Sequence, residues 1–231
     1  FKKYMAVGRN QWNFKKATIS QLLKIGIPSS LQIAMEAGAF AVSGILVGTI
    51  SAKAQAAHQI ALTCASFTFM VSLGLSQAGS IRVSNALGMQ NWTRISAIGK
   101  STLVLAVVYG ISCCIMFIAL NNYLPLLFNN EKEVIEIAAI LLIFAALFQI
   151  SDAIQATSAG LLRGIKDVNV PTVFIAIAYW VLGIPVGYLL AFKYNMKAEG
   201  IWLGFIIGLT FSALFLTWRF LKKIKTTVKP A

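Results

Sequence analysis

Residues 147–171 read LFQISDAIQATSAGLLRGIKDVNVP, and this stretch decides the fold. An acid, Asp152, lies within an apolar run that is long enough to cross a membrane. The run ends in Gly160-x-x-x-Gly164 and a charged turn, and Pro171 can then begin the next helix. A carboxylate inside a hydrocarbon layer costs about 3 kcal/mol or more, so Asp152 is a candidate functional residue.

The composition of the whole chain agrees with a membrane protein. Hydrophobic residues make up 58% of the sequence and charged residues only 12%, whereas a soluble domain carries about 25% charged residues. The net charge of +13 does not indicate a nucleic-acid partner, because the basic residues stand at the ends of apolar runs. We therefore expect an all-α polytopic membrane protein with lipid around it and no nucleic acid.

Six apolar runs have the length of a transmembrane helix. We predict spans at about 22–48, 54–80, 97–120, 136–162, 171–192 and 200–220. Together they form a lobe over 21–220, preceded by a leading segment, 1–20, and followed by a basic tail, 221–231. Pro185 lies inside the fifth span and predicts a kink, because it cannot donate a hydrogen bond to the carbonyl of Val181.

The distribution of lysine and arginine predicts the orientation. Basic residues concentrate at both ends of the chain and in alternate turns, and only Lys53, Lys132, Lys193 and Lys197 fall on the opposite side. Cytoplasmic segments carry the excess of basic residues, so we expect both ends in the cytoplasm. We also expect the membrane to be the plasma (inner) membrane.

Only two acids, Glu36 and Asp152, lie deep inside the predicted spans. A carboxyl group in a low-dielectric environment readily takes up a proton or a small cation, and two such groups could share one site. Counting about 1.5 Å per residue from the predicted span ends places the two groups about 15 Å apart in depth. Whether they share a site is therefore open at this stage.

Other polar residues of the spans are weaker, cavity-lining candidates. These are Gln32, His58, Gln59, Ser151, Gln155 and Tyr179. A single histidine at a helix start more often makes an interfacial hydrogen bond than it binds a ligand. The one histidine, and the lack of Cys-x-x-Cys, Gly-x-Ser-x-Gly and P-loop motifs, argue against an enzyme and against a bound cofactor.

Several stretches together resemble the MATE family, the multidrug and toxic compound extrusion transporters. The segment AQAAHQIALTCASFTFMVSLGLSQAGSIRVSNALG is similar to that family's eighth helix and the loop after it. SAGLLRGIKDVNVPT and YWVLGIPVGYLL resemble the tenth-to-eleventh helix region, and EGIWLGFIIG resembles the start of the last helix. The resemblance runs from about Ser20 to Lys225 and is closest to the C-terminal half of the NorM-like branch.

This resemblance implies one six-helix lobe of a twelve-helix antiporter that exports bulky organic or cationic compounds. It implies that Glu36 and Asp152 couple export to Na⁺ or H⁺, and that the partner is a missing N-terminal lobe. The family often places an aromatic hydroxyl on the eighth helix, where this sequence has Phe67 and Phe69. Because the chain begins at Phe1 and matches one half, we expect that it does not transport alone.

Two other functions stay open on the sequence. A flippase for lipid-linked precursors, from the same superfamily, should show a basic cavity for phosphate. A non-transporting scaffold or a channel is the other class, although a channel should show a filter or a ring-forming repeat.

Overall fold

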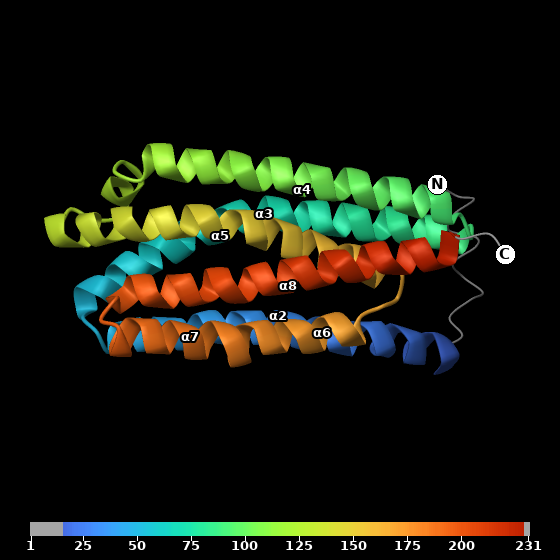
Figure 1. The fold of residues 1–231 in the computed structure, drawn as a ribbon, viewed down its shortest axis with the longest axis horizontal. Helices are drawn as coiled ribbons and strands as arrows, with labels where there is room; N and C mark the ends of the chain where they lie inside the picture. The colour runs from blue at the N-terminus through green and yellow to red at the C-terminus, as the bar shows by residue number, and fades with distance from the viewer. Residues whose placement is uncertain (1–15, 229–231) are drawn as a thin grey trace, which may run out of the picture.

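The computed structural model describes residues 16–228 and shows six membrane-length helical crossings (Figure 1). The first four are α2 (Lys16–Gly48), α3 (Ala52–Gly88), α4 (Trp92–Leu120) and α5 (Lys132–Gly164). The fifth is built from α6 (Asn169–Ala176), η2 (Ile177–Gly183), α7 (Ile184–Tyr188) and η3 (Leu189–Lys193), and the sixth is α8 (Lys197–Val228). A short 3₁₀ helix, η1 (Leu124–Leu127), precedes α5.

Each helical crossing contains one predicted span and continues beyond it at one end or both. Residues 16–20 of the predicted leading segment belong to α2, and 221–228 of the predicted tail belong to α8. Polar caps fix two helix starts: the Ser51 hydroxyl accepts from the Ala54 N–H at 3.0 Å, and the Asn91 side chain accepts from the Arg94 N–H at 2.9 Å. These two helices therefore begin at their polar caps, a few residues before the apolar runs from which the spans were predicted.

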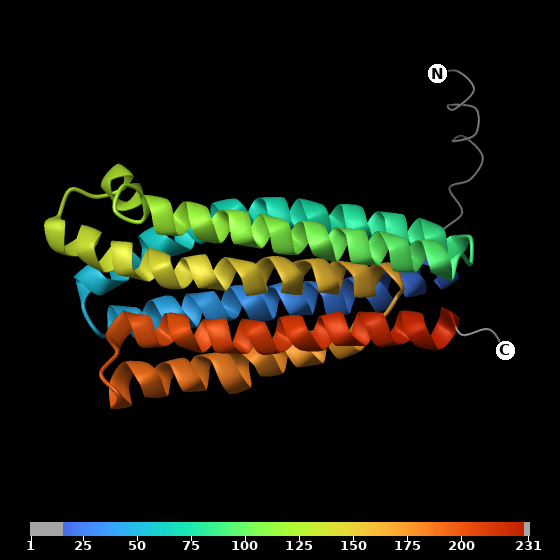
Figure 2. The same ribbon diagram turned by 45° about the horizontal axis from the view of Figure 1, so that its top comes forward.

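The helices run along one common direction, and successive crossings are antiparallel (Figures 1 and 2). The first and last described residues lie at the same end of the bundle, which we call the terminal end; the opposite end is the distal end. In the most apolar window of α5 and of α8, 56% of the residues are buried, against 22% in α2. Helix α2 is thus peripheral, while α5 and α8 form the centre.

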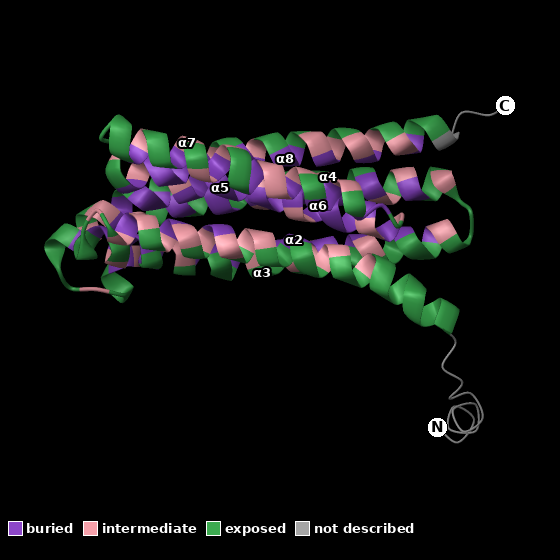
Figure 3. Cartoon of the chain, turned by 90° about the horizontal axis from the view of Figure 1, so that it is seen from below, coloured by how far each residue is buried: buried purple, intermediate pink, exposed green. Residues whose placement is uncertain are grey.

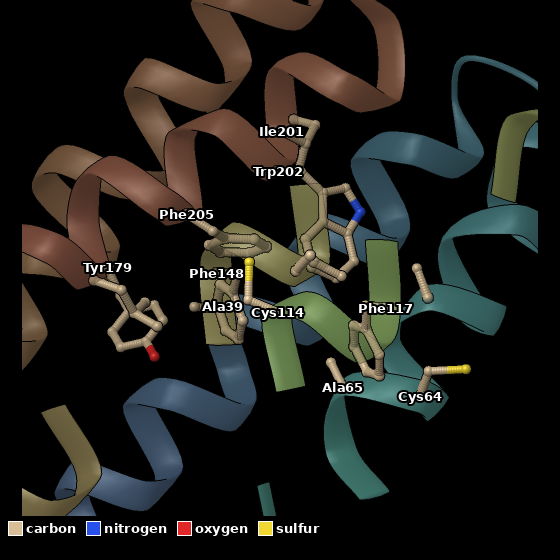
Figure 4. Packing of buried hydrophobic residues seen from close by; sticks show 14 of the residues in the cluster. Ala39, Cys64, Ala65, Cys114, Phe117, Phe148, Tyr179, Ile201, Trp202 and Phe205 are labelled. Carbon is tan, nitrogen blue, oxygen red and sulfur yellow. The ribbon is translucent and has the colours of Figure 1, made fainter. Parts of the chain in front are cut away.

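Large side chains fill the space between α5, α8 and the helices around them (Figure 4). Trp202 and Phe205 of α8 are fully buried, and Phe148 of α5 meets Trp202 edge-on, with ring centroids 5.8 Å apart. Phe40 of α2 packs against Phe148, and Tyr179 lies edge-on to the same Phe40 ring at 5.9 Å. This aromatic cluster holds α2 against the centre of the bundle.

The fifth crossing contains π-helical turns on both sides of Pro185. Proline lacks the N–H that an α-helix needs, and the Ile184 N–H bonds the carbonyl of Tyr179, five residues earlier. The crossing also packs closely on α8, where a Cβ on Gly204 would come within 2.5 Å of the backbone of Gly187. The small residues at spacing four in this region therefore serve close helix packing.

Candidate functional site

A cavity of about 420 Å³ opens between α2, α3, α5 and η2. Its wall is mostly apolar and aromatic, with carboxyl, amide and hydroxyl groups among the polar side chains. The lining residues are Ile33, Glu36, Ala37, Phe40, Gln59, Leu62, Thr63, Ala65, Ser66, Phe69, Met70, Phe148, Asp152 and Tyr179. A mostly apolar pocket with a few convergent polar groups is the usual form of a ligand site.

Both acids that the sequence places inside the spans line this one cavity. Glu36 comes from α2 and Asp152 from α5, and the carboxyl of Asp152 is buried at 5% exposure. No lysine or arginine is among the lining residues, and no ion pair involves either acid within residues 16–228. The structure thus places both acids on the wall of one cavity.

An amide joins the two helices that carry the acids. The Gln155 Nε2 atom donates to Glu36 Oε1 at 2.7 Å, and the Tyr179 hydroxyl donates to Gln155 Oε1 at 3.4 Å. Gln155 stands three residues after Asp152 on α5, so the amide and the acid face nearly the same direction. Tyr179 is only 1% exposed, and the π-helical turn of η2 places its ring in the cavity wall.

The other sequence candidates divide into two groups. Gln59 and Tyr179 line the cavity, while Gln155 and Gln32 lie behind it and contact Glu36. Gln32 and Glu36 are one helical turn apart on α2, which explains their proximity.

The structure corrects the placement of His58 and Ser151. His58 does not line the cavity: its Nδ1 accepts from Trp202 Nε1 at 3.0 Å, and its Nε2 faces the Ser43 hydroxyl at 3.3 Å. Ser151 points toward α8, where its hydroxyl is 2.8 Å from that of Thr210. Both residues sit on cavity-bearing helices, but their side chains point to another side of the helix and connect neighbouring helices.

Sequence reasoning missed the polar side of α3. Thr63 and Ser66 line the cavity with Gln59 and Met70, and the four residues recur at the spacing of one helix face. That spacing is visible in the sequence and could have identified the face. Phe69 also lines the cavity, whereas Phe67 is 82% exposed and points away.

A different arrangement of charge occupies the terminal end. The Asp167 carboxylate accepts from Arg219 Nε at 2.7 Å and from Arg219 Nη2 at 3.1 Å, and Lys223 Nζ lies 2.8 Å away. Burial would raise the pKa of the Asp167 carboxyl, but hydrogen bonds and charges from Arg219 and Lys223 outweigh it and hold that pKa below its usual value. This ion cluster ties the turn after α5 to α8.

Comparison with known proteins agrees with this architecture. The family model MatE matches residues 28–189. The chain is 37% identical to a probable multidrug resistance protein NorM of Agrobacterium fabrum, covering all of this chain and 50% of that protein. It is 36% identical to the multidrug resistance protein MdtK of Edwardsiella ictaluri, covering 88% of this chain and 45% of that protein.

Solved structures show the same fold. An outward-facing multidrug resistance MATE family transporter of the MOP superfamily superposes with a TM-score of 0.88 at 15% identity, covering 96% of this chain and 50% of that chain. The eukaryotic MATE transporter AtDTX14 superposes with a TM-score of 0.83 at 24% identity, covering 93% of this chain and 50% of that chain. The chain spans about half the length of the relatives it matches. With a MatE match over most of its length, this multi-pass membrane protein belongs to the MATE family of transporters.

Proposed function

We propose that this chain forms one lobe of a cation-coupled antiporter that exports bulky organic compounds, with Glu36 and Asp152 as the coupling groups. One observation carries the proposal: two carboxyl groups from different helices share an apolar cavity that no lysine or arginine lines. The names of the relatives, NorM and MdtK multidrug resistance proteins, support the export of drug-like compounds. The coupling ion is Na⁺ or H⁺.

The geometry suggests how ion binding changes the lobe. Two carboxylates in a low-dielectric cavity repel each other, and a cation or a proton between them removes the repulsion. Glu36 is on the peripheral helix α2 and Asp152 on the central helix α5, so ion binding draws α2 toward the centre. A bound organic cation would neutralise the same groups, so drug and ion compete through the conformations they favour.

The rest of the transporter completes the cavity. The partner is a second six-helix lobe, and the exposed faces of α2 and α3 beside the cavity are where we place it. The membrane is the plasma (inner) membrane, with the terminal end cytoplasmic, because Lys166, Arg219 and Lys223 lie there. The basic residues Lys2, Lys3, Arg9, Lys15 and Lys229, which also entered this prediction, lie outside the described residues.

The other candidate functions find less support in the cavity. A flippase for lipid-linked precursors would need positive charge for phosphate, and this wall carries two acids instead. A channel or a scaffold gives no reason for two carboxyl groups without an ion pair in one membrane-spanning cavity.

The test is transport by the full-length protein in proteoliposomes loaded with a fluorescent organic cation. We expect an imposed Na⁺ or H⁺ gradient to drive movement of the dye against its own gradient, and expect none when an ionophore dissipates the ion gradient. Comparing the two gradients identifies the ion. Dye movement that is equal with and without either gradient would show that the transport is not cation-coupled.

A further inference from the structure

A second hollow lies at the terminal end of the bundle, away from the coupling cavity. It is a groove of about 1030 Å³ between the first turns of α2 and the turn that joins α5 to α6. The first turns of α2 diverge from the bundle and are exposed (Figure 3). At Pro28 the two walls meet, because the Thr172 hydroxyl donates to the Pro28 carbonyl at 3.0 Å.

The groove is basic. Lys16, Lys24 and Lys166 line it, and no acid is among its lining residues. Within residues 16–228 none of these three lysines forms an ion pair. The acid next to them in sequence, Asp167, is already bonded to Arg219 and Lys223. Three cations that line a groove without an acid match an anionic ligand.

Lys166 also stands in a backbone position that favours glycine. Its φ is 61°, directly after the end of α5. The Lys166 N–H bonds the Arg163 carbonyl at 2.9 Å and the Asp167 N–H bonds the Leu162 carbonyl at 2.9 Å, the pattern that closes a helix with a left-handed residue. A lysine there accepts a strain that glycine would avoid, and such strain concentrates at functional positions.

Apolar side chains line the groove together with its lysines. Ile19, Leu23 and Ile27 line it at spacings of four residues along α2, and they are 42%, 52% and 62% exposed. In a membrane-spanning helix this stripe meets hydrocarbon, while the long lysine side chains reach toward the headgroup layer. The ligand that fits is therefore amphipathic, with a negative head and an apolar chain.

We propose that this groove binds an anionic phospholipid, with the phosphate among Lys16, Lys24 and Lys166 and an acyl chain along Ile19, Leu23 and Ile27. Basic pockets between helix ends at the membrane surface are typical sites for anionic headgroups. The site is separate from the coupling cavity, so lipid binding does not require that Glu36 and Asp152 bind an ion.

The test measures lipid binding to the detergent-purified full-length protein by native mass spectrometry, with dioleoyl phosphatidylglycerol and dioleoyl phosphatidylcholine at equal concentrations. We expect phosphatidylglycerol to bind at least about tenfold more tightly. The variant Lys16→Gln/Lys24→Gln/Lys166→Gln should lose this preference, since each lysine contributes about fivefold. The control variant, Arg82→Gln/Lys100→Gln/Lys225→Gln, removes the same charge from exposed positions outside the groove and should change binding less than about threefold.

A single substitution separates binding from folding. Lys166→Gly relieves the backbone strain, so the lipid-free protein should melt at a higher temperature while its affinity for phosphatidylglycerol falls about fivefold. An equal loss of phosphatidylglycerol affinity in both triple variants would show that the lipid is attracted by the overall positive charge, and would overturn the site. Displacement of the lipid by an equal concentration of inorganic phosphate would mean that the groove takes phosphate alone, and would overturn the assignment to a lipid.

Discussion

The protein surrounds its carboxylates in two different ways. At the terminal end, Asp167 is enclosed by Arg219 and Lys223, with three contacts between 2.7 and 3.1 Å. In the central cavity, Glu36 and Asp152 have an amide and hydroxyl groups around them, and neither forms an ion pair within the described residues. The first arrangement satisfies its charge permanently, while the second leaves charge that a mobile cation can neutralise. Pairing, more than burial, thus separates a structural acid from a candidate coupling acid.

The largest expected effect comes from neutralising the unpaired acids. Either Glu36→Gln or Asp152→Asn in the full-length protein should reduce gradient-driven dye efflux to that of protein-free vesicles, because the mobile cation loses a charged ligand. Both variants should still fold, since neutralising an acid that has no ion pair removes the cost of holding its charge in a largely apolar cavity. Glu136→Gln is the matched control on α5, where the acid is exposed, and it should transport normally. Wild-type efflux in both cavity variants would remove these residues from the coupling site.

Neutralising the paired acid, Asp167, should weaken the fold and leave ion coupling unchanged. Asp167→Asn should lower the free energy of unfolding at pH 7 by about 1–3 kcal/mol, less than for a fully buried pair because Arg219 and Lys223 are 24% and 43% exposed. Ion selectivity should stay unchanged.

The stability difference between the wild type and Asp167→Asn should depend on pH, because the pKa of the Asp167 carboxyl is lowered. A depressed carboxyl pKa stabilises the fold above the unfolded pKa of about 4, and the contribution is lost as the pH falls through the folded value. Thermal unfolding of wild type and variant should therefore differ by a constant amount from pH 8 to pH 5 and converge below about pH 4. A difference that grows toward low pH would contradict the assignment.

A smaller effect is expected at the amide that connects α2 to α5. Gln155→Leu removes the donor to Glu36 Oε1, so the carboxylate loses its orienting partner. Such partners commonly change ion affinity by about tenfold or more, and the concentration of coupling ion for half-maximal efflux should rise by about that factor. Gln59→Leu, which changes a cavity amide without a hydrogen bond to either acid, should have a smaller effect. Equal shifts in the two variants would argue against a specific role for Gln155.

The smallest effect should follow loss of the Tyr179 hydroxyl. At 3.4 Å from Gln155 Oε1 its hydrogen bond is long, so Tyr179→Phe should shift the half-maximal ion concentration by at most about fivefold, or about 1 kcal/mol. Tyr188→Phe, at an exposed position of the same crossing, serves as the control and should be silent. Complete loss of coupling in Tyr179→Phe would instead make the hydroxyl an ion ligand.

The sequence predicted the helices well because a membrane imposes a length on every apolar run. It also identified Glu36 and Asp152, since an acid is conspicuous in such a run. It could not predict that both acids line one cavity, because α2 and α5 are each 33 residues long and their ends are not level. In Figure 1, α2 reaches further toward the terminal end and α5 further toward the distal end, a stagger that fits the position of both acids at one cavity.

The direction of individual side chains was the second feature that the sequence could not predict. His58 and Ser151 are polar and stand near the site along the chain, yet their contacts are with Trp202 and Thr210 of α8. Which face of a helix meets a cavity depends on rotation about its axis, and long helices that are apolar on all sides give little information on it. Thr63 and Ser66 were missed for the same reason, although their spacing from Gln59 contained the signal.

The amide of Gln155 has one further consequence, which concerns leakage. Its nitrogen can only donate, to Glu36, and its oxygen can only accept, from Tyr179, so the order of hydrogen bonds has a single direction. A hydroxyl or a water in the same place could accept one proton and release another, but an amide does neither under ordinary conditions. A proton that reaches Glu36 therefore has no onward route through Gln155 into the packed interior beside α8. In the proposed antiporter, a proton bound to Glu36 would therefore exchange with the cavity and not pass through Gln155.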